Sequence, residues 1–354
     1  MTGLCKTEQL LAGGAGEAQA VSRAAEILRG GGLVAFPTET VYGLGANALD
    51  GDAVAKIFAA KERPGWDPLI VHVSDREMLD RVAMVPAEMD ERVAKLIAAF
   101  WPGPLTLLLP RTTAVPDAVT AGRPLVGVRM PAHPLTLELI RLAGVPVAAP
   151  SANRFGRTSP TTAAHVLEDL DGRIDAVLDG GATRVGIEST VLDVLRTPMV
   201  IYRPGAVTQE MIAEATGVAV EIFRPAVAGG DVAPESLPSP GVGLRHYAPR
   251  ARLELVSVAG VGDLRHSLHA AIERAHEADE VVGAILPDEW DASYAEETFG
   301  CGEWGDDDAF AHRIFAGLRS LDARGVDVIV CPVPVGDGVA VALRDRLEKA
   351  ARRK

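Results

Sequence analysis

Residues 33–48 read LVAFPTETVYGLGANA, and this stretch decides the fold expected for the first half of the chain. The apolar run Leu33–Phe36 predicts a buried strand that ends at Pro37. The polar residues that follow contain Gly43 and Gly45 and predict a loop crowded with hydroxyl groups and one carboxylate. Open α/β sheets bind ligands just beyond their strand ends. We therefore expect an α/β fold with a ligand site at this loop, against the alternative of a solvated turn.

The next elements support that expectation. Residues 52–61 predict a helix, and the following segment, KERPG, breaks it with Lys61 and Arg63 in an exposed loop. Helices and short apolar strands alternate up to about residue 202, which is typical of a sheet covered on both faces. Helices are predicted over residues 18–29, 86–101, 134–143 and from Ser159, as N-cap, to Leu170; strands are predicted over 69–73, 105–109, 124–130, 146–149, 176–178, 190–194 and 200–202.

A change in composition after Gly217 predicts a domain boundary. Residues 225–249 are rich in Pro, Gly and Ser without a sustained period, which is typical of a linker. A second alternation of strands and helices follows it and predicts a smaller Rossmann-like α/β domain. The predicted organisation is a catalytic domain over 1–218, a linker or lid over 219–250, and a C-terminal α/β domain over 251–354.

Composition excludes several classes of protein. The chain has 354 residues and a net charge of −13, which argues against stable nucleic-acid binding through a broad basic surface. No apolar run is long enough to span a bilayer, and no signal peptide is visible. Its three cysteines are far apart, so neither a disulfide framework nor a cysteine zinc site is expected. We expect a cytoplasmic protein without a membrane partner.

Common catalytic motifs are absent from the sequence, which contains no GxxxxGK[ST], GxSxG or HExxH. What remains is a set of cations and hydroxyl groups at the ends of elements. Each of them alone could be a surface charge or a cap. Together they suit phosphoryl or nucleotidyl transfer, which depends on positioning and charge neutralisation and requires no nucleophilic side chain. The set is Lys61, Arg63, Arg129, Ser151, Asn153, Ser189, Thr190 and Arg203.

These residues lie in stretches that closely resemble the two-domain threonylcarbamoyl-AMP synthases of the YrdC-like family. The matching stretches follow the family's order over almost all of residues 18–250, whereas the C-terminal region matches by position and α/β pattern alone. They are FPTETVYGLGANA (36–48), KERPGWDPLIVHV (61–73), WPGPLTLLL (101–109), VGVRMPAHP (126–134), PVAAPSAN (146–153), SPTTAAHV (159–166), DGG (179–181), ESTVLDV (188–194), YRPGAVT (202–208) and RHYAP (245–249).

The resemblance implies a twisted α/β sheet with a concave, positively lined cavity. It also implies condensation of L-threonine, bicarbonate or CO₂, and ATP to threonylcarbamoyl-AMP and pyrophosphate, with Mg²⁺, for the modification of tRNA to N6-threonylcarbamoyladenosine. The product would pass to a tRNA-modifying transferase complex. By motif position, the ATP-facing set is Lys61, Arg63, Ser151, Asn153, Ser159 and Arg203, with Lys61 and Arg63 as the catalytic cations. The threonine-facing set is Thr38, His72, Thr120, Arg129 and Ser189. No residues of the chain are predicted to hold a metal themselves.

The end of the linker predicts a lid. Residues 241–249 read GVGLRHYAP and contain two glycines, a cation and an aromatic ring before a proline. Long irregular segments in compact proteins are usually lids, binding segments or linkers. We expect this segment to cover the cavity with Arg245 or Tyr247 facing the nucleotide. A passive tether is the alternative.

Two rival functions remain at this point. One is an RNA-binding module without catalysis, against which the net charge counts. The other is the hydrogenase-maturation carbamoyltransferase, which embeds a similar domain. That protein also carries cysteine zinc motifs and an acylphosphatase segment, and neither is present in this sequence.

Overall fold

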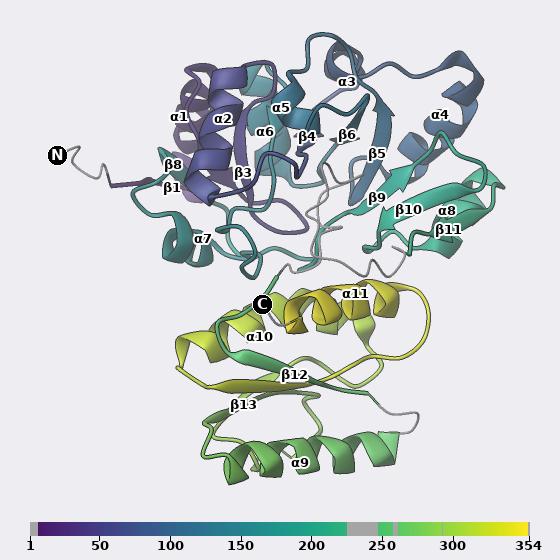
Figure 1. Ribbon diagram of the computed structural model, residues 1–354. Coiled ribbons are helices and arrows are strands. Elements are labelled where there is room, and N and C mark those ends of the chain that lie inside the picture. The colour runs from purple at the N-terminus through teal and green to yellow at the C-terminus, as the bar shows by residue number, and fades with distance from the viewer. Residues whose placement is uncertain (1–5, 225–246, 258–260, 292, 353–354) are drawn as a thin grey trace. The chain divides into compact units, whose positions relative to one another are not determined.

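The computed structural model describes residues 6–224, 247–257, 261–291 and 293–352. The chain forms two compact units (Figure 1). The first contains residues 1–155, 160–184 and 188–243. The second contains residues 244–354 together with two short segments of the first half, 156–159 and 185–187. Each unit has a sheet and a hydrophobic core of its own.

The first unit is built on a mixed eleven-stranded sheet, with the order β1-β8-β2-β3-β7-β4-β6-β5-β9-β10-β11. Its strands are β1 (Glu8–Leu11), β2 (Val34–Phe36), β3 (Gly43–Asn47), β4 (Ile70–His72), β5 (Leu105–Pro110), β6 (Leu125–Arg129), β7 (Val147–Ala148), β8 (Ala176–Asp179), β9 (Thr190–Asp193), β10 (Met199–Arg203) and β11 (Val220–Ile222). Its helices are α1 (Glu17–Arg29), α2 (Gly51–Lys61), α3 (Arg76–Val82), α4 (Asp90–Phe100), α5 (Asp117–Thr120), α6 (Pro134–Ala143), α7 (Ala163–Leu170) and α8 (Gln209–Thr216).

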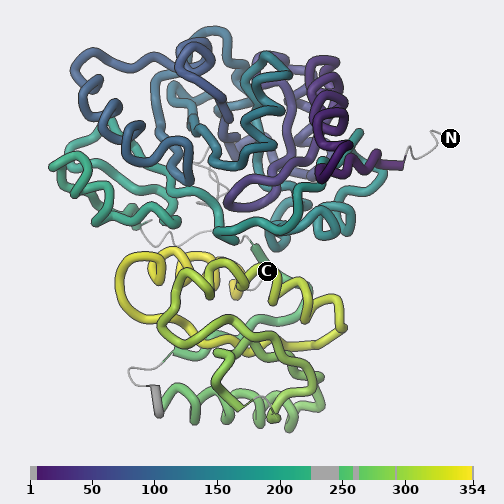
Figure 2. Tube along the Cα trace, turned by 180° about the vertical axis from the view of Figure 1, so that it is seen from behind, coloured from purple at the N-terminus to yellow at the C-terminus, as the bar shows by residue number. Residues whose placement is uncertain are grey.

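The second unit has a four-stranded parallel sheet with the order β12-β15-β13-β14. Helix α9 covers one face of this sheet, and α10 and α11 cover the other, as both views show (Figures 1 and 2). The elements are β12 (Arg252–Val256), α9 (Val261–Glu277), β13 (Val282–Leu286), β14 (Glu297–Gly300), α10 (Asp307–Ala323), β15 (Val328–Pro332) and α11 (Val339–Ala351). The prediction of an α/β fold with a smaller Rossmann-like C-terminal domain is therefore confirmed.

The loop predicted after Pro37 is only partly a loop. Residues Gly43–Asn47 form β3, which pairs antiparallel with β2 and brings Gly43 opposite Phe36. A Cβ atom at Gly45 would lie 2.5 Å from the Phe36 ring and 2.7 Å from Val147, so the glycine makes room for that ring. The sequence predicts these glycines in a loop, whereas in the structure they allow the strand to pack closely. The polar loop is thereby confined to residues 37–42.

Two further boundaries differ from the prediction. The N-cap of α7 is Thr162, whose hydroxyl accepts from the His165 amide, and Ser159 lies before it. Strand β11 pairs in parallel with β10, so the first sheet extends beyond the predicted boundary at residue 218. A three-residue strand carries too little periodicity to be recognised in sequence. Most of the predicted linker, including Arg245, lies outside the described residues.

Candidate active site

A row of polar and charged residues crosses the middle of the first sheet. The register of β4 and β6 places His72 beside Arg129. Strands β5 and β6 pair at Leu107 and Val128, so Thr106 lies next to Arg129 across that ladder. Val191 of β9 then pairs with Thr106 on one side and with Arg203 of β10 on the other. We call the polar members of this row, His72, Arg129, Thr106 and Arg203, the polar row; Val191 lies between the last two of them.

Arg129 is buried (3 % exposed) and is engaged on three sides. Its Nη2 atom lies 2.7 Å from the Glu39 carboxylate, its Nη1 donates to Thr40 Oγ1 (3.0 Å), and its Nε donates to the carbonyl of Gly103 (3.2 Å). The hydroxyl oxygens of Thr40 and Thr38 lie 2.8 Å apart. The polar loop after β2 therefore folds back onto the arginine of β6, and Thr38 and Arg129 belong to one network.

His72 and Thr120 contribute buried polar atoms without partners. Among the described residues, neither His72 Nδ1 nor Thr120 Oγ1 has a hydrogen-bond partner, and both side chains are at most 4 % exposed. Burial, reinforced by the charge of Arg129, lowers the pKa of His72 to about 3, so its ring is neutral at physiological pH. Buried polar atoms are normally paired. These two atoms are therefore suited to a polar ligand.

Ser189 is held at the other end of the polar row. Arg203 donates from Nη2 to the Ser189 hydroxyl (3.1 Å) and from Nε to the Ser189 carbonyl (3.0 Å). The same hydroxyl lies 2.9 Å from Thr106 Oγ1. All three side chains are buried. A serine predicted to face threonine and an arginine predicted to face ATP thus form one hydrogen-bonded pair.

Lys61 is not the exposed loop residue that was predicted. It is the last residue of α2, which begins at the Asp50 cap, and it is 1 % exposed. Its Nζ atom donates to the carbonyls of Asn153 (2.5 Å) and Ser151. Burial, and next the charge of Arg63, hold the pKa of Lys61 well below its usual value. The Lys61 amine therefore binds the backbone of Ser151 and Asn153, two residues that were predicted to belong to the same site.

Arg63 and Asp67 complete this second cluster. Glu62 adopts a left-handed conformation (φ 56°) and turns the chain after α2, so that Arg63 points inward, with 7 % of the residue exposed. Arg63 Nη2 lies 2.9 Å from the Asp67 carboxylate. Burial raises the pKa of Asp67, and the charges of Arg63, Lys61 and Arg203 oppose that shift in this order. Three of the predicted phosphate-binding cations therefore act on one carboxylate.

Comparisons with known proteins show the family of this chain. A family model described as "Telomere recombination" (Sua5, YciO and YrdC) matches residues 26–205, and a second, described as the C-terminal domain of threonylcarbamoyl-AMP synthase, matches residues 207–352. A curated threonylcarbamoyl-AMP synthase from Pyrococcus abyssi is 45 % identical over 93 % of each chain. The chain belongs to the threonylcarbamoyl-AMP synthase family. The resemblance deduced from its motifs is confirmed.

Further relatives of the synthase family extend the match. The Bacillus subtilis threonylcarbamoyl-AMP synthase is 41 % identical over 94 % of this chain and 92 % of its own. A crystal structure of P. abyssi Sua5 complexed with L-threonine superposes with a TM-score of 0.88 at 42 % identity, over 98 % of each chain. The chain is therefore an enzyme of the nucleotidyltransferase type. No helix among the described residues is long and apolar enough to cross a membrane.

Two further predicted residues, Ser159 and Tyr247, lie in the second unit. Ser159 is fully buried and belongs to the segment 156–159. The ring of Tyr247 is 1 % exposed; it stacks on Phe315 of α10 at 5.6 Å, and the Arg346 guanidinium lies 5.1 Å from its centroid. Because its faces pack against protein side chains, we do not carry Tyr247 into the proposed nucleotide site. Arg245 stays a prediction outside the described residues.

Sequence reasoning did not assign several residues that build the site. Glu39 and Thr40 hold Arg129, Thr106 holds Ser189, and Asp67 holds Arg63. All four lie inside quoted family stretches, and Glu39, Thr40 and Asp67 share their stretch with assigned residues, so a search for polar partners within those stretches could have found these three. Thr106 carries no such signal, because its role depends on the pairing of β5 with β6 and β9.

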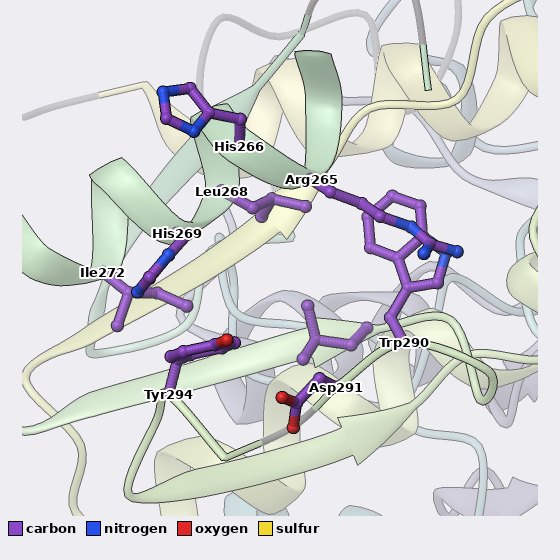
Figure 3. A pocket seen from close by; sticks show the side chains of 9 residues that line it. Arg265, His266, Leu268, His269, Ile272, Trp290, Asp291 and Tyr294 are labelled. Atoms are coloured by element: carbon purple, nitrogen blue, oxygen red, sulfur yellow. The ribbon is translucent and has the colours of Figure 1, made fainter. Parts of the chain in front are cut away.

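A pocket of about 280 Å³ lies in the second unit, between α9 and the loop after β13 (Figure 3). The Arg265 guanidinium lies 4.9 Å from the ring centroid of Trp290, and the rings of His269 and Tyr294 are 4.0 Å apart. These aromatic side chains are thus already paired with the protein's own groups. None of the sequence-predicted site residues lines this pocket.

Proposed function

We propose that the polar row and the Lys61 cluster together form the site that condenses L-threonine, bicarbonate or CO₂, and ATP to threonylcarbamoyl-AMP and pyrophosphate. The observation that carries the assignment is the group of buried cations, Lys61, Arg63 and Arg203, that share one electrostatic neighbourhood at Asp67. Cations gathered in this way are suited to an anionic ligand, and the polyphosphate of ATP is one. The product would serve formation of N6-threonylcarbamoyladenosine in tRNA and pass to a tRNA-modifying transferase complex.

The reaction requires no nucleophilic side chain. An oxygen of threonine carbamate forms a bond to the α-phosphorus of ATP, while the bond from that phosphorus to the oxygen bridging to the β-phosphate breaks and pyrophosphate leaves. Lys61, Arg63 and Arg203 would neutralise the phosphate charge that grows in the transition state. Within the described residues, the Lys61 amine donates to two carbonyls, so its ammonium form keeps one proton for a phosphate oxygen. A bound anion would also raise its lowered pKa and favour that form.

Threonine would bind at the polar row. Arg129 is suited to its carboxylate, although Glu39 and Thr40 already occupy part of the guanidinium, so the substrate would share it with them. The unpartnered atoms of His72 and Thr120, with the hydroxyls of Thr38 and Ser189, would receive the polar groups of the amino acid. L-Threonine bound in P. abyssi Sua5 supports this choice of substrate.

Mg²⁺ would arrive bound to the ATP phosphates, whose oxygens are ligands that it prefers. Across the part of the chain that the structure describes, no three or more His, Cys, Asp and Glu side chains are grouped so that they could hold a metal ion. The ion would add positive charge to the phosphates that Lys61 and Arg63 bind.

One assay tests the proposal directly. The full-length protein should release pyrophosphate from ATP only when L-threonine and bicarbonate are both present, and the adenylate should be detected by mass spectrometry. Pyrophosphate release that does not depend on L-threonine, or does not depend on bicarbonate, would contradict the assignment. An RNA-binding module without catalysis would show neither dependence and would instead bind RNA with an affinity that falls steeply with salt.

A further inference from the structure

One face of α10 is buried although it contains an arginine. Ala311, Phe315 and Arg319 recur at intervals of four residues, so they share a face of the helix. They are 2 %, 0 % and 9 % exposed. We call this surface the α10 face. A buried arginine must be compensated by hydrogen bonds, and its acceptors therefore show what the face holds.

Arg319 holds the segment 156–159. Its Nη2 atom donates to the carbonyl of Thr158 (2.5 Å), and its Nε makes a longer contact with the carbonyl of Ser159 (3.4 Å). The Thr158 hydroxyl in turn donates to the carbonyl of Tyr247 (3.1 Å), whose ring stacks on Phe315. The amide of Ala248 donates to the carbonyl of Gly156 (2.9 Å). This segment is thus bound along its backbone, which fixes its conformation as well as its location.

Gly186 holds the second segment, 185–187, against the same helix. A Cβ atom at Gly186 would lie 2.2 Å from the Ala311 carbonyl oxygen and 2.5 Å from His312 Cα. Its φ of +83° is also left-handed, a conformation that favours glycine. The backbone therefore approaches α10 more closely than any residue with a side chain would allow.

Both segments continue into residues of the proposed site. Ser159, of the ATP-facing set, ends the first segment, and Asn153 stands three residues before Gly156. Ser189, whose hydroxyl accepts from Arg203, stands three residues after Gly186. A displacement of about 1 Å in a substrate-positioning group can cost roughly 10²-fold in rate. The position of α10 under these segments therefore bears on catalysis.

We propose that the α10 face is a positioning platform, in which Arg319 sets the segment carrying Ser159 and the close packing at Gly186 sets the segment leading to Ser189. The inference rests on the proposed function, because it assigns these segments to ATP and threonine. A merely structural role of the α10 face would affect both substrates alike. The platform predicts that the two substitutions act on different substrates. A change at Arg319 should lower kcat/KM for ATP, whereas a change at Gly186 should raise KM for threonine.

The test uses full-length variants. Arg319→Met should lower kcat/KM for ATP by ~10²-fold with threonine saturating and leave KM for threonine within about twofold of the parent. Arg319→Lys keeps the charge and one donor and should recover part of the loss. Arg313→Met, on another face of the same helix, is the matched control, since Arg313 pairs with Asp288 at 42 % side-chain exposure.

Gly186→Ala should instead raise KM for threonine, by roughly 10-fold or more. Its control is Gly217→Ala, which imposes a similar left-handed strain (φ +72°) with nothing within 4 Å of the new Cβ. Rates are normalised to the folded fraction. Hydrogen exchange of the Ala248 amide in Arg319→Lys reports the segment directly and should speed up.

Equal losses for both substrates, losses no greater than in the controls, or unchanged exchange at Ala248 would each overturn the platform. If the parent enzyme itself lacked threonine- and bicarbonate-dependent pyrophosphate release, the proposed function would fail. The exchange measurement would then still decide whether Arg319 holds the segment.

Discussion

The two sheets of this protein differ in what their central strands carry. In the first sheet, the adjacent strands β4, β6 and β5 bury His72, Arg129 and Thr106, and β10, which lies beyond β9, buries Arg203. In the second, the central strands β13 and β15 are buried and apolar throughout. Parallel α/β sheets commonly bind ligands at their strand ends. The candidate site also lies at strand ends, because His72, Arg129 and Arg203 are the last residues of β4, β6 and β10, but it lies on the mixed sheet. What distinguishes that sheet from the second is the set of polar side chains that its strands bury.

The strongest test of the comparison is substrate choice at the polar row. A site that bonds a hydroxyl leaves its own polar atoms unpaired when valine binds, so valine should be rejected by ~10⁴–10⁵ in kcat/KM. Serine lacks a methyl group but keeps the hydroxyl, so it should be disfavoured by roughly 10–200-fold. Kinetics with the three amino acids measure this. If kcat/KM for valine equalled that for serine, the polar row would not recognise the hydroxyl group of threonine.

Arg129→Met should destabilise the protein by about 3–5 kcal/mol, because it leaves the Glu39 carboxylate buried without its partner. The double variant Arg129→Met with Glu39→Gln removes both charges and should recover much of that stability but no activity. Urea denaturation and the pyrophosphate assay separate the two effects. Equal stability of the single and double variants would show that the ion pair does not compensate the buried charges.

Lys61→Ala should lower turnover by ~10²–10³, since it removes one preorganised contact to the phosphates. Lys56→Ala is the matched control on the same helix, because its amine also donates to a backbone carbonyl, that of Gly31 (2.7 Å), away from the cluster. Steady-state kinetics on folded protein compare the two. Turnover of Lys61→Ala within a few-fold of Lys56→Ala would remove Lys61 from the site.

His72 predicts an acid sensitivity of the first unit. Its pKa falls from 6.5 in the unfolded chain to about 3 in the fold, so between these values the unfolded state binds a proton that the folded state does not. Stability is therefore complete above about pH 6.5 and is lost as the pH falls toward 3, at roughly 1.4 kcal/mol per pH unit. Denaturation at pH 7, 5 and 4 should show a shallower decline for His72→Gln. Identical slopes would show that His72 is not buried as a neutral ring.

The smallest effect is expected in the second sheet. Ile329→Val on β15 removes one methylene from a fully buried side chain and should cost about 0.5–1.5 kcal/mol. Turnover per folded molecule should be unchanged, because the apolar strands carry no substrate contact. A lower kcat in fully folded Ile329→Val would contradict the view that only the first sheet carries the chemistry.

Local signals allowed much of the fold to be predicted. Helix α6 has the predicted bounds, since Pro134 occupies its first turn and Gly144 ends it with a φ of +67°. Strand β3 was missed, because its glycines are explained only by the Phe36 ring across the hairpin. The cap of α7 was placed at Ser159 although Thr162 holds it, because both residues begin plausible capping sequences.

The sequence by itself determined the family and the residue types of the site. Its motif stretches contain Lys61, Arg63, Arg129, Ser189 and Arg203, and the structure buries all five of these residues. Only the tertiary structure decided that Lys61 is buried, because its acceptors stand some 90 residues further along the chain. It likewise decided that His72, Arg129 and Arg203 share one row, and that α10 holds the segments 156–159 and 185–187. Strand register and long-range hydrogen bonds set these relations, and neither leaves a periodic signal in the sequence.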